Sequence, residues 1–450
     1  MVDSEKSIQI VCSKGFSQRL EEDRISQLPD PLICQILSHL PTKEAVTTSV
    51  LSSRWTSLWL WVPSLVLSSG DFSDSNAFAS FGDRFFHSDR VSCLDKLELA
   101  INGNEYKSYI MTWIDAAVKR KLQHLRVKCY IRHCFCEMPV SLYVCQTLVS
   151  LKLVEVVFGD VEFVSFPRLK TMHLICVWVS KDAAFKKLVS CCPVLEDLQI
   201  FGCANAPQPL RVHSQSLKRL DIGYGFSTQV DSVPEVVIDA PQLCCLMIFD
   251  NTSKSFIVNN LEYTAKLEVN ITFGLNVSDE ASVLSGRGLI RSFLSGILKV
   301  GDLKIYWQTF QIICDYSKSE SLPQFGYMSR LCVSLSSQHL KGLATFLESC
   351  PNLKSLVVVL HRGYHYQELH PVEMNQIKCL QSSLEFVDFK FTFSGHFTEM
   401  KLVGYFLENC AILKKLTLHL DSNSTEDEIV KKLLEIPRAS TTCEVVIVKK

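Results

Sequence analysis

The chain has 450 residues, of which 47% are hydrophobic and 21% are charged, so it can bury a sizeable core and is not disordered throughout. Lys and Arg together number 46 against 47 for Asp and Glu, and this near-neutral balance gives no indication of a nucleic-acid or membrane partner. The sequence shows neither an apolar run that could cross a bilayer nor the apolar core of a secretory signal, which predicts a protein of the cytosol or nucleus.

Residues 1–22 are expected to form a disordered N-terminal tail. The 19 cysteines of the chain are an odd number, and without a secretion signal we interpret them as reduced thiols that pack as small hydrophobic side chains. Four N-x-S/T sequons would support the alternative of a secreted glycoprotein; they begin at Asn251, Asn270, Asn276 and Asn423. Such short motifs often arise by chance, so we do not expect them to carry glycans.

After the tail, residues 28–61 predict three short helices that are rich in large apolar side chains. Asp30 is a candidate N-cap with Pro31 at the first helical position, and apolar residues follow at helical spacing: Leu32, Ile33, Ile36, Leu37 and Leu40. Pro41 ends this run, and Thr42 is a candidate cap for the second helix. The third helix is expected in RWTSLWLW, with Trp55, Leu58, Trp59 and Trp61.

The apolar residues of this helical segment lie on more than one face, and a unit of about 40 residues is near the lower limit for folding alone. A cap that only covers the end of a repeat array needs one apolar face and a polar outer one. We therefore expect one apolar side to pack on the repeats that follow, while another remains for a separate partner. The simpler alternative is that the segment serves as an end cap alone.

From residue 94 onward the sequence repeats a leucine-type pattern, L-x-x-L-x-L, in which other aliphatic residues are tolerated. Its units begin at Leu94, Leu122, Leu148, Leu169, Leu195, Leu217, Leu243, Thr264, Val300, Met328, Leu353, Leu384 and Leu413. Most intervals fall in or near the range of about 20 to 29 residues that is typical of leucine-rich repeats. The alternating end of the pattern suits a short strand, so we expect an α/β solenoid with parallel strands on its concave side and helices on its convex side.

Three units carry a cysteine three residues before their first pattern leucine, each after an amphipathic run: Cys192, Cys350 and Cys410. The repeated offset predicts a helix, a buried cysteine, a tight turn and a strand. We therefore interpret these cysteines as residues that fill the core and not as reactive thiols.

Two clusters of possible metal ligands interrupt the pattern; the spacing of the first fits no standard zinc frame, and the second lies between repeat units beside Gly363 and Pro371. One, in CYIRHCFCEM, consists of Cys129, His133, Cys134 and Cys136. The other, in HRGYHYQELH, consists of His361, His365 and His370. We interpret the first as core or loop packing and the second as a solvated loop. Since H-E-x-x-H, G-x-S-x-G and kinase motifs are also missing from the sequence, we predict no catalytic residue, no metal site and no cofactor.

The segment DRISQLPDPLICQILSHLPTKEAVTTSVLSSRWTSLW resembles an F-box, in the version found in the large plant family that combines an F-box, leucine-rich repeats and an FBD domain. The matching residues are Leu28-Pro29-Asp30, Ile36-Leu37, Leu40-Pro41-Thr42-Lys43, Ala45-Val46, Ser49-Val50-Leu51-Ser52, Arg54-Trp55 and Leu58-Trp59. Pro31 and Thr56 depart from the resemblance, because an acidic and a basic residue are common at these two places.

The C-terminal part resembles an FBD domain in SSLEFVDFKFTFSGHFTEMKLVGYFLENCAILKKLTL and IPRASTTCEVVIV. The matching residues are Leu384, Gly395, Glu399, Tyr405, Leu407-Glu408-Asn409, Leu413-Lys414-Lys415, Pro437-Arg438-Ala439-Ser440 and Cys443. The resemblance therefore implies an F-box over 23–69, leucine-rich repeats over 70–370, and an FBD domain over 371–450 that continues the solenoid.

The resemblance also implies a function: a non-catalytic substrate receptor of a Skp–cullin–F-box ubiquitin ligase. The F-box would dock on a SKP-type adaptor, and through it on the cullin and RING subunits, while the repeats would hold a protein to be ubiquitinated. Adaptor contact is implied for Leu28, Pro29, Ile36, Leu37, Leu40, Pro41, Val46, Leu51, Trp55 and Leu58. The alternative is a leucine-rich-repeat binding protein or small-molecule sensor without ligase coupling.

Polar residues that alternate with the core leucines face the opposite side of the predicted strands, which makes them candidates for substrate contact. They are Glu98, Arg126, Lys152, His173, Gln199, Asp221, Glu268, Lys304, Asp388 and Thr417. Their mixed charges do not indicate one class of ligand.

Overall fold

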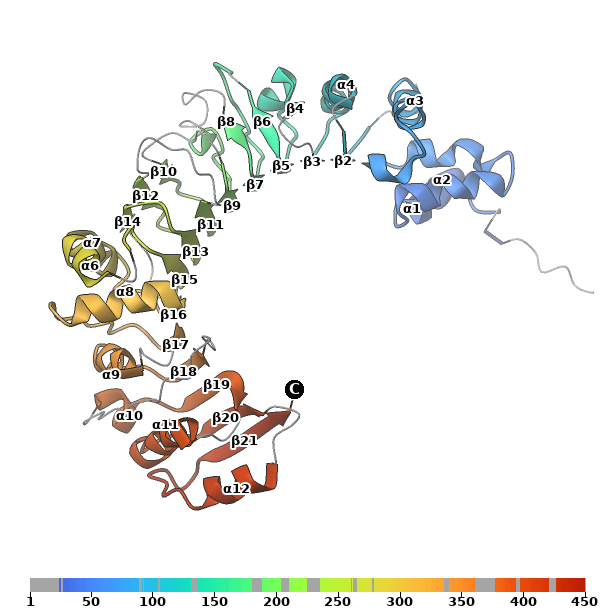
Figure 1. The fold of residues 1–450 in the computed structure, drawn as a ribbon. Coiled ribbons are helices and arrows are strands. Elements are labelled where there is room, and N and C mark those ends of the chain that lie inside the picture. Colours follow the sequence, from blue (N-terminus) through green and yellow to red (C-terminus); the bar gives the residue numbers. More distant parts are fainter. Residues whose placement is uncertain are drawn as a thin grey trace, which may run out of the picture.

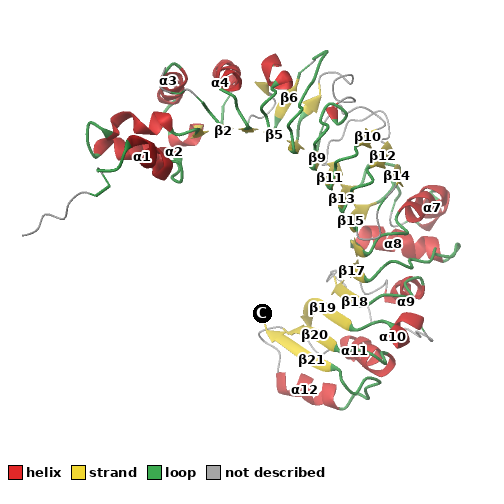
Figure 2. Cartoon of the chain, turned by 180° about the vertical axis from the view of Figure 1, so that it is seen from behind, coloured by secondary structure: helices red, strands yellow, loops and turns green. Residues whose placement is uncertain are grey.

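A computed structural model shows an open arc of stacked units that begins with a small helical module (Figure 1). Strands line the inner side of the arc and helices lie on its outer side, as both views show (Figures 1 and 2). The structure describes residues 24–25, 27–88, 91, 93–103, 106–130, 136–159, 161–179, 188–203, 210–224, 235–259, 261, 265–276, 279–335, 340–360, 377–393, 397–420 and 426–449. The tail predicted over 1–22 lies outside the described residues.

The inner side of the arc is one parallel sheet, with fifteen strands in the described part of the chain. In sheet order these are β1 (Ser64–Ser68), β2 (Lys96–Ile101), β3 (His124–Cys129), β5 (Ser150–Val154), β7 (Thr171–Ile175), β9 (Asp197–Phe201), β11 (Arg219–Tyr224), β13 (Cys245–Asp250), β15 (Lys266–Ile271), β16 (Asp302–Ile305), β17 (Arg330–Leu335), β18 (Ser355–Leu360), β19 (Phe386–Phe393), β20 (Lys415–Leu420) and β21 (Glu444–Lys449). Sheet order follows chain order, so each unit adds one strand beside the last, as a repeat solenoid does.

Each strand buries its pattern leucines and turns the residues between them toward the inner face. In β2, Leu97 and Leu99 are buried while the residue between them is half-exposed, and β3, β5 and β7 show a similar alternation. Just before the strands, the Lys170 carbonyl accepts the N–H groups of Glu196 and Asp197 at 2.9 and 3.0 Å. Such contacts fix the register, because a slip of one residue would turn the leucines toward solvent.

The outer side differs between the ends and the middle of the arc. Toward the ends it is built from helices: α3 (Ser75–Phe86), α4 (Lys107–Lys119), α6 (Glu280–Ser285), α7 (Arg287–Gly296), α8 (Trp307–Ser317), α9 (Leu340–Glu348), α10 (Lys378–Ser382), α11 (Phe397–Asn409) and α12 (Glu426–Leu434). The middle carries two small parallel sheets: β4 (Cys136–Glu137), β6 (Val156–Phe158) and β8 (Trp178–Val179), then β10 (Leu210–His213), β12 (Glu235–Asp239) and β14 (Ser255–Asn259).

The α/β solenoid with its strands on the concave side is therefore confirmed, and the two outer sheets are an addition to the prediction. Units in the middle of the arc are short, at 21 to 26 residues between successive pattern starts, and outside the middle only the unit from Met328, which carries α9, is as short, at 25 residues. Less chain is thus available between successive inner strands, and strands of two to five residues occupy the outer side there. The 3-10 helices η3 (Ser69–Asp71) and η5 (Val140–Val144) complete the outer connections.

The N-terminal module contains α1 (Asp30–Leu37), α2 (Thr42–Thr47) and the 3-10 helices η1 (Thr48–Val50) and η2 (Trp55–Trp61). Helices α1 and α2 begin one residue earlier than predicted, because Pro29 and Pro41 take the N-cap positions with ψ angles of 146° and 145°. Neither Asp30 nor Thr42 caps its helix. Instead, Thr42 Oγ1 accepts a hydrogen bond from the Val66 N–H at 2.8 Å, which links α2 to β1 and covers the first edge of the inner sheet.

The three repeated cysteines are core residues, as predicted. Cys192, Cys350 and Cys410 are almost completely buried. Burial raises the pKa of Cys192 to about 12 and raises the pKa of the other two thiols as well. These side chains therefore stay protonated at neutral pH and act as small hydrophobic groups.

Candidate functional site

Helix α1 presents two apolar stripes to opposite environments. Ile33 and Leu37, one turn apart, are 0% and 1% exposed and pack in the core. Leu32 and Ile36, also one turn apart, are each 46% exposed. Since residues at i and i+4 share a helix face, one stripe holds the module together and the other faces outward.

Apolar exposure continues in the residues after α1. Leu40 is 37% exposed, Val50 at the end of η1 is 87% exposed, and Leu51 is 65% exposed. We call Leu32, Ile36, Leu40, Val50 and Leu51 the exposed apolar set. Exposed apolar side chains that gather in one small module are typical of a protein interaction site.

The structure divides the ten residues that were implied to contact an adaptor. Pro29, Ile36, Leu40, Pro41 and Leu51 are exposed, and Leu28 and Val46 are half-buried against the core. The remaining three are buried inside the module: Leu37, Trp55 and Leu58. Their packing holds the shape of the module, and adaptor contact stays a prediction for all ten residues.

Two members of the exposed apolar set were missed in the sequence. Leu32 and Val50 belong to the apolar pattern of the segment, but periodicity alone does not say which of two apolar stripes is the buried one. Leu32 lies one turn before Ile36, so the spacing of that pair was the available signal.

An ion pair closes the outer side of the module. Arg54, just before η2, lies with Nη2 2.6 Å from Asp30 Oδ1 at the start of α1, and its guanidinium also donates to the Leu28 carbonyl. Both charged side chains are largely exposed, so the pair adds little stability. Its two-point geometry instead orients the chain that leads into α1.

Aromatic rings join the module to the solenoid. Trp59 in η2 stacks on Phe81 and Phe85 of α3, with ring centroids 5.2 and 6.0 Å apart. Helix α3 in turn packs tightly on α4 at Gly82, where an added Cβ atom would lie 2.1 Å from the Trp113 ring. Such dense packing gives the module a fixed place against the first units.

The ten residues predicted to face a substrate lie in one line across the inner face. Strand register places Glu98 beside Arg126, Arg126 beside Lys152, and each later member of the set in the same row of the sheet. The row also contains five residues that the polar criterion missed: Val66, Met247, Cys332, Val357 and Val446. Register alone would have identified them, because their strands follow the same alternation.

This row is called here the inner row, and two of its members form a close ion pair. Lys304 Nζ lies 2.7 Å from Glu268 Oε1, and His419 Nε2, which lies outside the row on β20, is 3.0 Å from Asp388 Oδ1. The Tyr306 hydroxyl also donates to Glu268 Oε1 at 2.5 Å. Burial, and then this contact with a carboxylate, raises the pKa of Tyr306, so its hydroxyl remains a donor at neutral pH.

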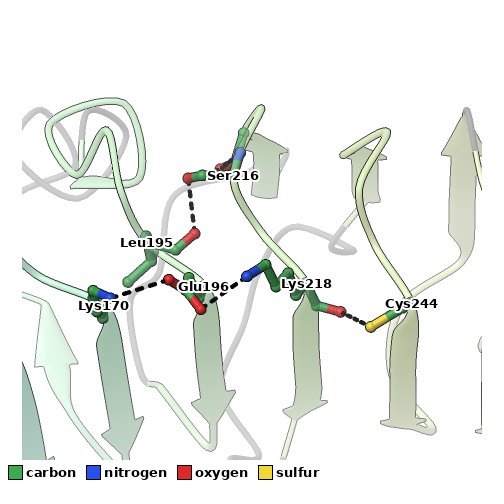
Figure 3. A network of polar contacts seen from close by, with 7 residues as sticks. Lys170, Leu195, Glu196, Ser216, Lys218 and Cys244 are labelled. Carbon is green, nitrogen blue, oxygen red and sulfur yellow. Dashed lines mark hydrogen bonds and ion pairs between the residues drawn. The ribbon is translucent and has the colours of Figure 1, made fainter.

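A second polar network lies where the strands begin (Figure 3). Glu196 lies between two lysines, 3.5 Å from Lys170 Nζ and 3.1 Å from Lys218 Nζ, and Lys218 holds the pKa of the Glu196 carboxyl below its usual range. In the same region, the Ser216 hydroxyl donates to the Leu195 carbonyl at 2.8 Å. These contacts join neighbouring units at the surface, where ion pairs contribute little energy.

The metal-site candidates of the sequence receive no support as a site. His133, Cys134 and all three histidines of the second cluster lie outside the described residues. Cys129 and Cys136 are buried, and within the described ranges no group of three His, Cys, Asp or Glu side chains is arranged to hold a metal ion. Among the same residues, no helix has the length and apolar character needed to span a bilayer.

Family models match three parts of the chain. An F-box domain model matches residues 25–67, a model described as FBD-associated F-box protein At5g56370, LRR repeats, matches residues 110–269, and an FBD model matches residues 374–418. These matches follow the order that the sequence implied.

Several Arabidopsis thaliana proteins are similar to the chain over nearly its whole length. The FBD-associated F-box protein At5g53635 is 55% identical, covering 94% of this chain and 100% of its own length. The F-box/FBD/LRR-repeat protein At2g05300 is 50% identical, covering 97% and 99%. The F-box/LRR-repeat protein 13 is 41% identical, covering 95% and 96%.

Proposed function

Because the chain belongs to the F-box/FBD/leucine-rich-repeat family, we propose that it is the substrate-recognition subunit of a Skp–cullin–F-box ubiquitin ligase. Its F-box docks a SKP-type adaptor, which connects it to the cullin and RING subunits in the cytosol or nucleus. Its inner face holds the protein to be ubiquitinated. The chain itself is non-catalytic, and the RING subunit and its conjugating enzyme supply the chemistry.

The exposed apolar set carries this proposal. Burying a large apolar side chain contributes on the order of 1.5–3 kcal/mol relative to leaving it in water. A surface ion pair such as Asp30–Arg54 contributes about 0–1 kcal/mol. Apolar burial is therefore the stronger of the two available driving forces, and a partner with an apolar groove fits this module better than a charged one.

The rigid junction between the F-box and the solenoid explains how adaptor docking positions a substrate for ubiquitin transfer. Trp59 fixes the module on α3, and Gly82 brings α3 against the Trp113 ring of α4. A substrate held on the inner face is thereby kept at a defined place relative to the adaptor. Ligase function then follows from effective concentration, since binding converts a bimolecular encounter into a local one.

The test is co-purification of the full chain with a SKP-type adaptor, comparing wild type with Ile36→Asp/Leu51→Asp. Both positions are exposed, so the module stays folded. Docking, however, would bury two unpaired carboxylates at a cost of several kcal/mol, which corresponds to a loss of more than about 100-fold in affinity.

The matched control is Val140→Asp/Phe163→Asp, which changes two side chains that are each 67% exposed on the solenoid. This control should keep full adaptor binding. Wild-type binding that survives in the Ile36→Asp/Leu51→Asp variant would contradict the proposed docking face. Failure of the wild-type chain to bind any SKP-type adaptor would leave the alternative of a leucine-rich-repeat binding protein without ligase coupling.

A further inference from the structure

The inner row is not uniform in charge, and two stretches of the inner face break its pairing of opposite charges. The first lies on β3 and β5. Arg126 and Lys152 are direct neighbours in register, and Lys128 projects from the same strand as Arg126. Like charges side by side destabilise a sheet, whereas Glu268 and Lys304 in the same row pair opposite charges.

The three basic groups have little compensation within the described residues. Arg126 Nη1 lies 3.9 Å from Glu98, at the limit of an ion pair. Lys128 Nζ lies 4.2 Å above the Tyr130 ring, and in the described part of the chain neither Lys128 nor Lys152 forms an ion pair. This stretch therefore presents an uncompensated positive field to the inside of the arc.

The second stretch lies on β9 and β11 and has the opposite sign. Asp197 and Asp221 are half-buried, and each has a buried Oδ1 atom that accepts no well-aligned hydrogen bond. His173 Nε2 approaches Asp197 Oδ1 only to 3.5 Å. Arg219 is the register neighbour of Asp197 and its charge favours the ionised form of both carboxyl groups, but in the described structure it forms no ion pair with either. A buried acceptor without a donor is costly and rare in native proteins.

Aromatic side chains border these carboxylates. Phe201 lies over Gly223, where an added Cβ atom would be 2.3 Å from the ring. Phe249 packs edge-on to Tyr306 with centroids 5.1 Å apart, and the Asn270 Oδ1 atom beside Phe249 in the register is a third buried oxygen without a donor. Carboxylates, an amide oxygen and aromatic rings together suit a cationic group that donates hydrogen bonds.

Strand order sets the distance between the two stretches. β3 and β11 are separated by β5, β7 and β9, and neighbouring strands are about 4.8 Å apart. The outermost strands of the two stretches, β3 with Arg126 and β11 with Asp221, are therefore about 19 Å apart across the arc. An extended peptide, at about 3.3 Å per residue, covers that distance in about five or six residues.

Resting on the proposed function, we propose that the inner face selects an extended protein segment with two oppositely charged side-chain groups. Acidic side chains lie over Arg126, Lys128 and Lys152, and basic side chains lie over Asp197 and Asp221, about five or six residues away. A nucleic acid fits less well, because Asp197 and Asp221 would repel its phosphates. The near-neutral total charge of the chain conceals this order, since it averages over both stretches.

The experiment is a selection from a displayed library of random linear peptides against the full chain in complex with a SKP-type adaptor. The expected result is enrichment of peptides with an acidic and a basic group separated by about five or six residues. A synthetic version of the enriched peptide is then titrated by fluorescence anisotropy. Enrichment without this charge order, or equal competition by a single-stranded RNA oligonucleotide, would overturn the proposal.

Charge reversal with compensation distinguishes recognition from a structural effect. Arg126→Glu/Lys152→Glu should weaken the selected peptide about tenfold or more, and a peptide with lysines in place of its acidic residues should recover that loss on the variant. Lys415→Glu on β20 is the matched control and should leave binding unchanged. Equal weakening of both peptides would contradict the proposal. Adaptor binding is measured on the same samples, so failure of the docking proposal is seen separately.

Discussion

The exposed apolar set of the F-box and the inner face of the solenoid use opposite chemistry on one chain. The first is a small group of aliphatic side chains on a module whose other side is packed against α3. The second is a long row of mostly charged and polar side chains, some of them already paired with each other. Apolar burial gives affinity without much discrimination, whereas ordered charges discriminate between partners. The difference suits the proposed function, in which one surface docks a common adaptor and the other selects a particular substrate.

The largest effect that tests this comparison is on α1 itself. Leu37→Asp places a charge in the core of the module, where no partner is available, and should unfold it at a cost of several kcal/mol. Ile36→Asp, one residue earlier, should leave the free energy of unfolding within about 0.5 kcal/mol of wild type. Limited proteolysis and thermal unfolding of the two variants measure the difference.

That contrast is specific to the two stripes of α1. Loss of folding in Ile36→Asp would mean that the outer stripe also serves the module's own stability, and the end-cap alternative would then explain its apolar residues. Unchanged stability in Leu37→Asp would contradict the assignment of Leu37 to the core.

The next effect concerns the junction that keeps the two surfaces in a fixed relation. Gly82→Ala adds a methyl group against the Trp113 ring, and the overpacking should cost about 1–3 kcal/mol. Gly288→Ala is the control, because Gly288 lies within α7 with no atom near an added Cβ. Alanine should stabilise that exposed helix position by up to about 1 kcal/mol.

Urea unfolding of both glycine variants measures these opposite signs. If Gly82→Ala is as stable as wild type, α3 and α4 are able to move apart and the junction is not rigid. Adaptor binding of Gly82→Ala should persist, since the exposed apolar set lies on the other side of the module.

Sequence periodicity was sufficient to predict the solenoid, because burying a row of leucines leaves few alternative arrangements of the units. The pattern leucines from Leu94 to Leu413 are all buried in the described units, and their spacing fixes one strand in each unit. The short outer sheets were not predicted, because β4 and β8 have only two residues each. Pairing between such distant short strands depends on how the units stack and not on local pattern.

The sequence predicted that the helical module has two apolar faces, but it did not show on which face each residue lies. The apolar surplus of residues 28–61 indicated two faces, but it did not show that Leu37 faces inward and Leu32 outward. That choice depends on the packing of η2 against α1, which brings Leu58 and Trp55 to one side. Likewise, the alternation of the strands identified the polar inner residues, but only the register places Arg126 beside Lys152.

The smallest expected effect distinguishes two carboxylates of the inner face. Burial, with repulsion from Asp197, raises the pKa of Asp221, so at neutral pH its charge weakens the fold. His173 lowers the pKa of Asp197, so that charge strengthens the fold. Asp221→Asn should therefore increase the free energy of unfolding at pH 7 by up to about 1 kcal/mol, and Asp197→Asn should decrease it by a similar amount, since both groups are partly screened by solvent.

The pH dependence of the free energy of unfolding tests the sign of each carboxylate's contribution. The penalty from Asp221 disappears as the pH falls through its raised folded-state pKa, so the advantage of Asp221→Asn over wild type should shrink on acidification. The contribution of Asp197 is present above the ordinary Asp pKa of about 3.9 and is lost only as the pH falls through its lowered pKa. Denaturant unfolding at a series of pH values measures both differences. A destabilised Asp221→Asn variant at pH 7 would show that this carboxylate is already compensated within the fold, and a cationic partner would then have nothing to neutralise there.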